Sequence, residues 1–167
     1  MLSTDAVVHQ LYESPEVRDA VVERFGAQVA PDGVVDRGAL AEAAFADGES
    51  RAWLEGLLWP RVGARIVEWR ADADAAEPPV AAAVVEVPLL FEAGMEAGFD
   101  ATIAVVADET LRAERAASRG HRAVDERAAR QLSQQEKAER ATYVVVNDGS
   151  LVDLQEKLSR LLDILRG

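Results

Sequence analysis

In the second half of the sequence, three short segments each follow an apolar run, and a ligand site is expected at these segments. They are Pro88 to Glu92, Asp108, and Asn147 to Gly149. Each preceding run is typical of a buried strand, and open parallel sheets bind ligands at the carboxyl ends of their strands. On spacing alone, a turn or a helix cap is the simpler interpretation of each segment.

Basic residues gather between two of these strand ends, from Leu111 to Arg140. This stretch holds eight Lys or Arg and five Asp or Glu residues, although the whole chain has a net charge of −12. Arginine suits phosphate oxygens because its planar fork donates two parallel hydrogen bonds, so the stretch would suit a small polyphosphate. The alternative is a solvated helix surface with Glu–Lys and Glu–Arg pairs and no ligand.

The composition limits the class of protein. The chain has 167 residues, of which 49% are hydrophobic and 29% charged, and this suits one folded domain. Its acidic balance argues against general binding of DNA or RNA. Because there is no cysteine and there are only two histidines, thiolate chemistry and Cys- or His-rich metal sites are not expected. Neither a membrane span nor a signal peptide is recognisable, so we expect a cytoplasmic protein without membrane contact.

Helices and turns are predicted for the first half of the chain. Ser14 is expected to cap a helix that ends at Gly26, and Asp36 is expected to cap a second, short helix. A longer amphipathic helix follows, and Pro60 should kink or break it. Residues 71–79 are predicted to form a polar linker.

Strands alternate with helices in the second half. Buried strands are predicted before Pro88, over residues 101–107 and over residues 143–146. Helices are expected over 108–119, over 125–140 and from Ser150 onward, the last with a buried leucine face from Leu151 to Leu165. Because strand and helix alternate in this order, we predict an α/β fold with a parallel sheet covered by helices.

Several short motifs follow one another along the chain. The most distinctive is the strand end Val87-Pro88-Leu89-Leu90-Phe91-Glu92. The others are Ser3-Thr4-Asp5-Ala6; Asp36-Arg37-Gly38-Ala39-Leu40 with Phe45; Leu57-Leu58-Trp59-Pro60; the R-x-x-x-R pair Arg115 and Arg119; and Gln131, Lys137 and Ala141 with Asn147-Asp148-Gly149. In this order and spacing they resemble the dephospho-CoA kinase family nearly from end to end, with Trp59 in place of the family's histidine and Thr142 in place of its aspartate.

The resemblance implies a P-loop-kinase-like parallel sheet with flanking helices, in a single domain over residues 1–167. A helical substrate lobe is expected over about 10–79, and an α/β core over 80–167 with a lid at about 112–140. The family begins with a strand, a G-x-x-x-x-G-K-[ST] loop that holds the ATP phosphates, and a helix. No such pattern occurs in this sequence. We therefore expect that this N-terminal unit is absent, that the sheet lacks its middle strand, and that Met1 is an internal or misassigned start.

The implied activity is transfer of the γ-phosphoryl group of ATP to the ribose 3′-hydroxyl of dephospho-CoA, with Mg²⁺, as the final step of coenzyme A biosynthesis. Asp5, which on its own would be a helix cap, would orient or deprotonate that hydroxyl or help to hold Mg²⁺. The resemblance also implies that Arg115 and Arg119 close over the phosphates, and that Asn147 and Gly149 lie at the adenine pocket. The acceptor would be flanked by Leu89, Leu90, Phe91 and Glu92, and cradled by a lobe that includes Asp36 and Arg37.

Two other functions stay open at this point. A chain without the phosphate loop would fit a non-catalytic module that binds a CoA precursor or docks on a partner. A related nucleoside monophosphate kinase is the other candidate, although the motif from Pro88 to Glu92 argues against it. The sequence does not indicate an oligomeric state.

Overall fold

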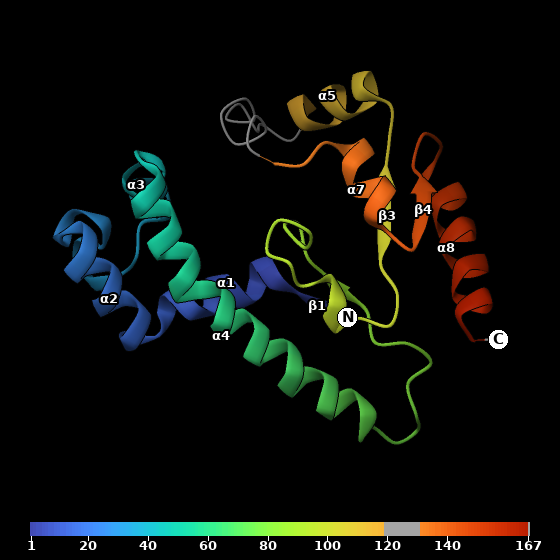
Figure 1. The fold of residues 1–167 in the computed structure, drawn as a ribbon, viewed down its shortest axis with the longest axis horizontal. Helices are drawn as coiled ribbons and strands as arrows, with labels where there is room; N and C mark the ends of the chain where they lie inside the picture. The colour runs from blue at the N-terminus through green and yellow to red at the C-terminus, as the bar shows by residue number, and fades with distance from the viewer. Residues whose placement is uncertain (119–130, 167) are drawn as a thin grey trace. The chain divides into compact units, whose positions relative to one another are not determined.

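The structure, a computed structural model, describes residues 1–118 and 131–166, which fall into two units (Figure 1). The first unit, Met1–Pro88, contains β1 (Leu2–Ser3), α1 (Thr4–Glu13), α2 (Pro15–Phe25), the 3₁₀ turns η1 (Ala27–Val29) and η2 (Pro31–Gly33), α3 (Arg37–Phe45), α4 (Gly48–Asp74) and β2 (Val85–Glu86). The second, Leu89–Gly167, contains η3 (Glu96–Gly98), β3 (Ile103–Val106), α5 (Glu109–Ser118), α7 (Gln134–Arg140), β4 (Tyr143–Val146) and α8 (Leu151–Arg166). None of the described helices is long and apolar enough to cross a membrane.

Capping side chains fix the helix starts of the first unit, as the sequence predicts. The Ser14 hydroxyl accepts the N–H of Val17 at 3.3 Å, and α2 ends at Gly26, whose φ of +91° favours glycine. The Asp36 carboxylate accepts the N–H groups of the second and third residues after it, at 2.8 and 3.0 Å. These predictions are confirmed because capping depends on local chemistry.

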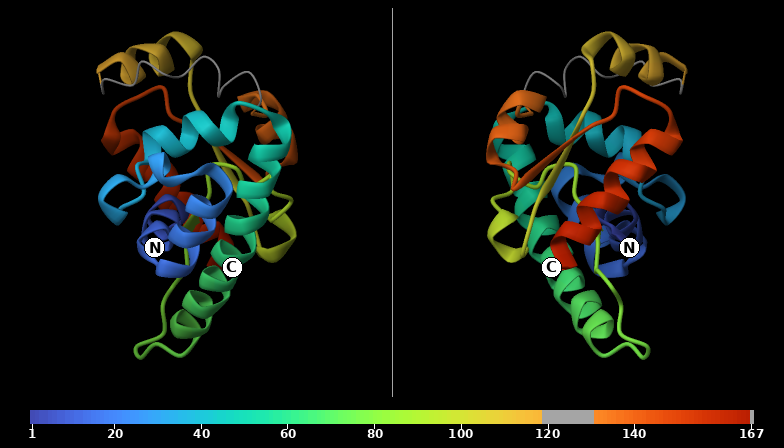
Figure 2. Two further views of the ribbon diagram at one scale, coloured as in Figure 1. Left: turned by 90° about the vertical axis from the view of Figure 1, so that its left-hand side faces the viewer. Right: turned by 90° about the vertical axis from the view of Figure 1, so that its right-hand side faces the viewer.

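Helix α4 is not broken at Pro60, where the sequence predicts a kink or a break. It runs for 27 residues from Gly48 to Asp74, and its length is clear in the side views of Figure 2. The first part of the predicted linker, residues 71–74, is therefore helical too. Proline lacks an N–H, so the Gly56 carbonyl loses its helical donor. The Arg61 guanidinium donates to the next carbonyl, that of Leu57, at 2.8 Å. Since α4 also packs against α1 and α3, tertiary packing outweighs the local effect of the proline.

The core of the first unit lies among α2, η1, α3 and α4. Its buried side chains include Val17, Val21, Val29, Leu40, Ala44, Leu54 and Leu58. Trp53 of α4 meets Phe25 of α2 edge to face, with ring centroids 5.4 Å apart. This aromatic contact adds to the apolar burial that holds the helices together.

A short parallel pair, β1–β2, belongs to the same unit. Leu2 pairs with Val85 and Ser3 with Glu86, so β2 covers only part of the strand predicted before Pro88. The buried Thr4 hydroxyl donates to the Glu86 carbonyl at 3.0 Å. This bond fixes the main chain at the carboxyl end of β1.

The second unit is built on the parallel pair β3–β4. Four residue pairs are in register, from Ile103 with Tyr143 to Val106 with Val146. Helix α7 packs against β3, and α8 packs against β4 (Figure 1). Among the described residues, the strands thus form two separate two-stranded parallel sheets flanked by helices.

Helix α7 is shorter than the predicted helix over 125–140. It begins at Gln134, and residues 125–130 lie outside the described part of the chain. Ser133 and Glu136 form a reciprocal capping box at its start. The box explains the late beginning, since it satisfies the first free N–H groups of the helix.

Helix α8 begins after Ser150 as predicted, but its leucine face is not fully buried. Leu161 is 7% exposed, whereas Leu151 is 71% and Leu165 is 41% exposed. A sheet of two strands is too small to cover sixteen residues of helix, so the ends of the apolar face remain in contact with water.

Candidate functional site

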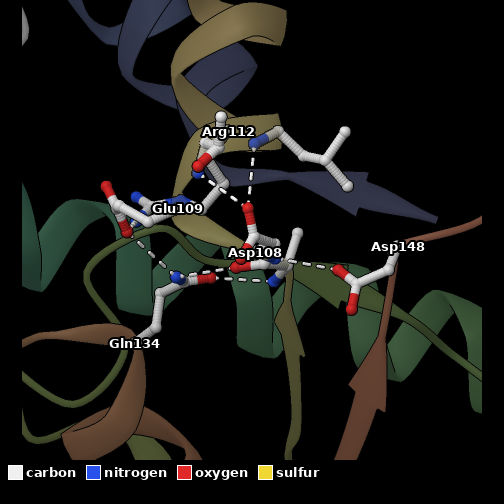
Figure 3. Close-up of polar contacts among 8 residues, drawn as sticks. Asp108, Glu109, Arg112, Gln134 and Asp148 are labelled. Carbon is white, nitrogen blue, oxygen red and sulfur yellow. Dashed lines mark hydrogen bonds and ion pairs between the residues drawn. The ribbon is translucent and has the colours of Figure 1, made fainter.

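A polar network closes the carboxyl end of β3 (Figure 3). The Gln134 side chain makes two hydrogen bonds to Ala107: its Oε1 accepts the N–H at 2.9 Å, and its Nε2 donates to the carbonyl at 3.0 Å. The next N–H, that of Asp108, donates to the Asp148 carboxylate at 2.8 Å. Because these main-chain groups are paired, the chain leaves β3 in a fixed direction.

Asp108 starts helix α5 at this point. Its Oδ1 accepts the N–H groups of Thr110 at 2.9 Å and Leu111 at 3.3 Å, which confirms the cap that the sequence predicts. The Glu109 carboxylate, which accepts from Arg112 at 2.7 Å, also joins the network through Gln134 at 3.4 Å (Figure 3). The first arginine of the basic stretch is therefore paired within its own helix.

Arg115 lies further along α5 and reaches the loop that follows β4. Its Nη1 donates to the Asn147 carbonyl at 2.8 Å, and its Nη2 donates to the Gly149 carbonyl at 3.3 Å. Lys157 of α8 donates to the neighbouring Val146 carbonyl at 2.6 Å. Three predicted site residues, Arg115, Asn147 and Gly149, are thus brought together, with the arginine holding the main chain of the other two.

The turn from Leu89 to Gly94 is a second rigid feature of this unit. The Ala93 N–H donates to the Leu89 carbonyl at 3.0 Å, and Gly94 has a φ of +63°. Phe91 is 8% exposed and anchors the turn, while Leu89 and Leu90 are half-buried. Glu92 points to α7, where its carboxylate lies 3.0 Å from the Lys137 ammonium group.

In the first unit, Asp5 is the second residue of α1, directly after β1 and Thr4. Its side chain is exposed. The N-cap position belongs to Ser3, so the interpretation of Asp5 as a helix cap is wrong. The carboxylate stands instead at the carboxyl end of a parallel strand, where ligands bind in open α/β sheets.

Asp36 and Arg37 lie at the start of α3. The Asp36 carboxylate serves as its N-cap, and the exposed Arg37 guanidinium lies 3.4 Å from His9 Nδ1 on α1. Burial raises the pKa of the nearby Tyr12 hydroxyl, and the charge of Arg37 lowers it by less. These contacts join α3 to α1. Arg119, the remaining predicted site residue, lies outside the described residues.

Sequence reasoning missed the structural roles of Gln134 and Lys157. Gln134 contacts a residue 27 positions earlier, and Lys157 contacts one 11 positions earlier. A glutamine or lysine on a predicted helix carries no sign of such a partner. Sequence reasoning did single out the segment from Asn147 to Gly149. It did not predict that the Asp148 carboxylate accepts the Asp108 N–H.

A family model described as dephospho-CoA kinase matches residues 1–153 of this chain. The chain belongs to the dephospho-CoA kinase family. A relative of that name from Deinococcus radiodurans is 39% identical over 165 residues, which cover 97% of this chain and 78% of the relative. Another, from Anaeromyxobacter dehalogenans, is 40% identical over 151 residues, which cover 88% of this chain and 71% of the relative.

Solved structures confirm the predicted fold class, that of P-loop kinases. TT1252 from Thermus thermophilus matches with a TM-score of 0.76 and 32% identity, and the match covers 99% of this chain and 84% of that one. The dephospho-CoA kinase from Campylobacter jejuni matches with a TM-score of 0.67, 25% identity and the same coverage. The dephospho-CoA kinase motifs therefore lie on a fold that suits them, with parallel strands and flanking helices.

The metal that a kinase of this family implies would find few protein ligands here. Within residues 1–118 and 131–166, no group of three or more His, Asp or Glu residues is placed to hold a metal ion. Asp5 offers a single exposed carboxylate. A divalent metal that takes one protein carboxylate, with substrate phosphates and water as its other ligands, is compatible with this donor set.

Proposed function

We propose that this protein takes part in the ATP-dependent phosphorylation of dephospho-CoA at its ribose 3′-hydroxyl, which gives coenzyme A. The observation that carries the proposal is the match of residues 1–153 to the dephospho-CoA kinase family. Relatives with that name support it, because they align with almost the whole chain.

Asp5 is proposed to act on the acceptor hydroxyl. Its carboxylate is exposed at the carboxyl end of β1, and the Thr4–Glu86 hydrogen bond fixes the main chain beside it. A positioned carboxylate can accept the hydroxyl proton as phosphoryl transfer proceeds. Magnesium bound to the ATP phosphates would neutralise their charge, and Asp5 is the described residue that we propose as its protein ligand.

Arg115, Asn147 and Gly149 are proposed to form the adenine side of the ATP site. Arg115 holds the carbonyls of the other two residues, so the loop after β4 has a defined shape before any nucleotide binds. Preformed positioning of this kind contributes to phosphoryl transfer, which depends on geometry and charge more than on covalent chemistry. Arg119 is proposed to contact the phosphates.

Leu89 and Leu90 are proposed to contact the acceptor, since both remain partly exposed in a turn of fixed shape. Phe91 is buried and is better suited to hold that turn than to touch a ligand. In the first unit, Arg37 is exposed and would bind a phosphate of dephospho-CoA, with Asp36 fixing the helix that carries it.

A second candidate function is a non-catalytic module that binds a CoA precursor. It is favoured by one observation, the lack of a G-x-x-x-x-G-K-[ST] motif in the 167 residues. Such a module would bind dephospho-CoA through the acceptor residues but would transfer no phosphoryl group.

Formation of CoA, followed by mass, separates these functions. The 167-residue chain is incubated with ATP, Mg²⁺ and dephospho-CoA, beside a second protein that carries a strand–loop–helix segment with the G-x-x-x-x-G-K-[ST] motif ahead of Met1. The control is this second protein with the motif lysine replaced by alanine. CoA from either test protein supports the kinase. Calorimetric binding of dephospho-CoA without any CoA formation favours the module, and no binding at all contradicts both.

A further inference from the structure

The Glu92 carboxylate joins two segments of the second unit that are about forty residues apart in sequence. Its Oε1 lies 3.0 Å from Lys137 Nζ and accepts the Leu132 N–H at 3.0 Å. The side chains of Glu92 and Lys137 are only 16% and 22% exposed. Glu92 Oε2 is buried and has no hydrogen-bond partner among the described residues, so the positive charge of Lys137 compensates a carboxylate that water scarcely reaches.

The turn that carries Glu92 gives this carboxylate a defined position. Phe91, the preceding residue, is buried, and the Met95 N–H donates to the Leu90 carbonyl at 3.0 Å. The conformation of Gly94, with a φ of +63°, completes the turn. The turn therefore fixes the position of Glu92, and Glu92 in turn can fix the positions of Leu132 and Lys137.

The contacts of Glu92 converge on the start of α7. Leu132 directly precedes the capping residue Ser133, and Lys137 lies inside the helix. The first residue of the helix, Gln134, is the one that pairs with both main-chain groups of Ala107 at the end of β3. A chain of short contacts thus runs from Glu92 through α7 to the strand end from which α5 departs.

We infer that Glu92 is a positioning residue, which acts through Lys137 and α7 on the carboxyl end of β3, and not a ligand of dephospho-CoA. The expected effect of Glu92 on ligand binding rests on the proposed function. The expected effect of Glu92 on Ala107 rests on the structure alone. It assigns Glu92 a role different from the one that the family resemblance implies, because Oε1 is already bonded to Lys137 and to the Leu132 N–H.

Hydrogen exchange of the Ala107 amide, measured by NMR, tests the structural part in the 167-residue chain. Lys137→Met and Glu92→Gln should each accelerate this exchange at least about fivefold, although it is Gln134 that pairs with the main chain of Ala107. Lys137→Arg, which keeps the positive charge, should leave the exchange of the Ala107 amide as slow as in the parent chain. The matched control is Arg160→Met, which removes an exposed ion pair with Glu156 on α8. Unchanged Ala107 exchange in both test variants, with folding intact by circular dichroism, would overturn the inference.

Calorimetric titration with dephospho-CoA tests the part that concerns ligands. If Glu92 acts through Lys137, the two single variants and the double variant should weaken binding by the same factor, since each breaks the same link. If Glu92 is a direct ligand, Glu92→Gln weakens binding whether or not Lys137 is present, and Lys137→Met alone has no effect; this result would overturn the inference. A parent chain that binds no dephospho-CoA counts against the proposed function, and the exchange measurement still decides the role of Glu92.

Discussion

The Arg115 guanidinium donates a 2.8 Å hydrogen bond to the main-chain carbonyl of Asn147, so a side chain expected at the phosphates holds the loop that follows β4. The second terminal nitrogen of the same guanidinium donates to the Gly149 carbonyl, so Arg115 bonds two carbonyls of the loop at once. Lysine cannot reproduce this fork, because its ammonium group is a point donor on a flexible stem. If Arg115 acts on a nucleotide, as we propose, it acts through the shape of this loop.

We expect Arg115→Lys to weaken ATP binding at least about tenfold and to leave dephospho-CoA binding within twofold, since the charge is kept but the loop loses its second contact. Isothermal titration with each ligand measures both effects. Arg112→Lys is the matched control, because Arg112 lies on the same helix and pairs with Glu109 at the surface. If the variant weakened the binding of ATP and of dephospho-CoA by the same factor, Arg115 would not act on the loop alone.

The sequence predicted those features that depend on neighbours along the chain. Ser14, Asp36, Asp108 and Ser150 were recognised as caps, and the strands at 103–106 and 143–146 were recognised from apolar runs bounded by polar residues. These choices are made locally, so the residue types suffice to predict them. The predicted burial of the two strands was wrong, since Val105 is 53% and Val144 is 46% exposed in sheets of only two strands.

Features that depend on distant packing were not predictable in the same way. Pro60 was expected to kink or break this helix, but α4 is unbroken because it packs against other helices. Glu92 and Lys137 form an ion pair across forty-five positions, and neither residue signals the other. The leucines of α8 were all expected to be buried because the pattern shows an apolar face but not the width of the sheet that covers it.

Replacement of Asp5 by asparagine tests the proposed base. In the protein that carries a phosphate-binding loop, we expect Asp5→Asn to lower turnover at least about 10²-fold, the size typical of a positioned general base. Because the Asp5 side chain is exposed, the melting temperature should fall by no more than a few degrees, from the loss of one negative charge in the first turn of α1. Steady-state kinetics with ATP and dephospho-CoA give the comparison, and a loss below threefold would remove Asp5 from the mechanism.

The capping box of α8 predicts a pH dependence of stability. Hydrogen bonds from the Ser150 hydroxyl and N–H lower the pKa of the Asp153 carboxyl below its ordinary value. A depressed folded-state pKa contributes stability above the unfolded-state pKa, and this contribution is lost as the pH falls through the folded-state value, below about pH 4. Asp153→Asn should therefore flatten the decline of the urea midpoint between pH 6 and pH 3. Asp163→Asn on the same helix is the control, and an identical decline in the Asp153 variant and the parent would contradict the prediction.

Gln134→Glu tests whether the double contact with Ala107 holds the end of β3. A carboxylate can still accept the Ala107 N–H, but it cannot donate to the Ala107 carbonyl, and it repels Glu109, which lies 3.4 Å from the present amide nitrogen. An unpaired, partly buried carbonyl costs about 1–3 kcal/mol, so we expect a loss of that size in the free energy of unfolding at pH 7, measured by urea denaturation. Gln135→Glu is the matched control, since the Gln135 side chain bonds Glu139 on the exposed face of α7 and the change should shift stability by less than about 0.5 kcal/mol. At pH 4 the new carboxyl is largely protonated and can donate to the Ala107 carbonyl again, so the difference from the parent should shrink. A loss that is the same at both pH values would mean that the donated hydrogen bond contributes little, and that α7 is held against β3 by its apolar packing.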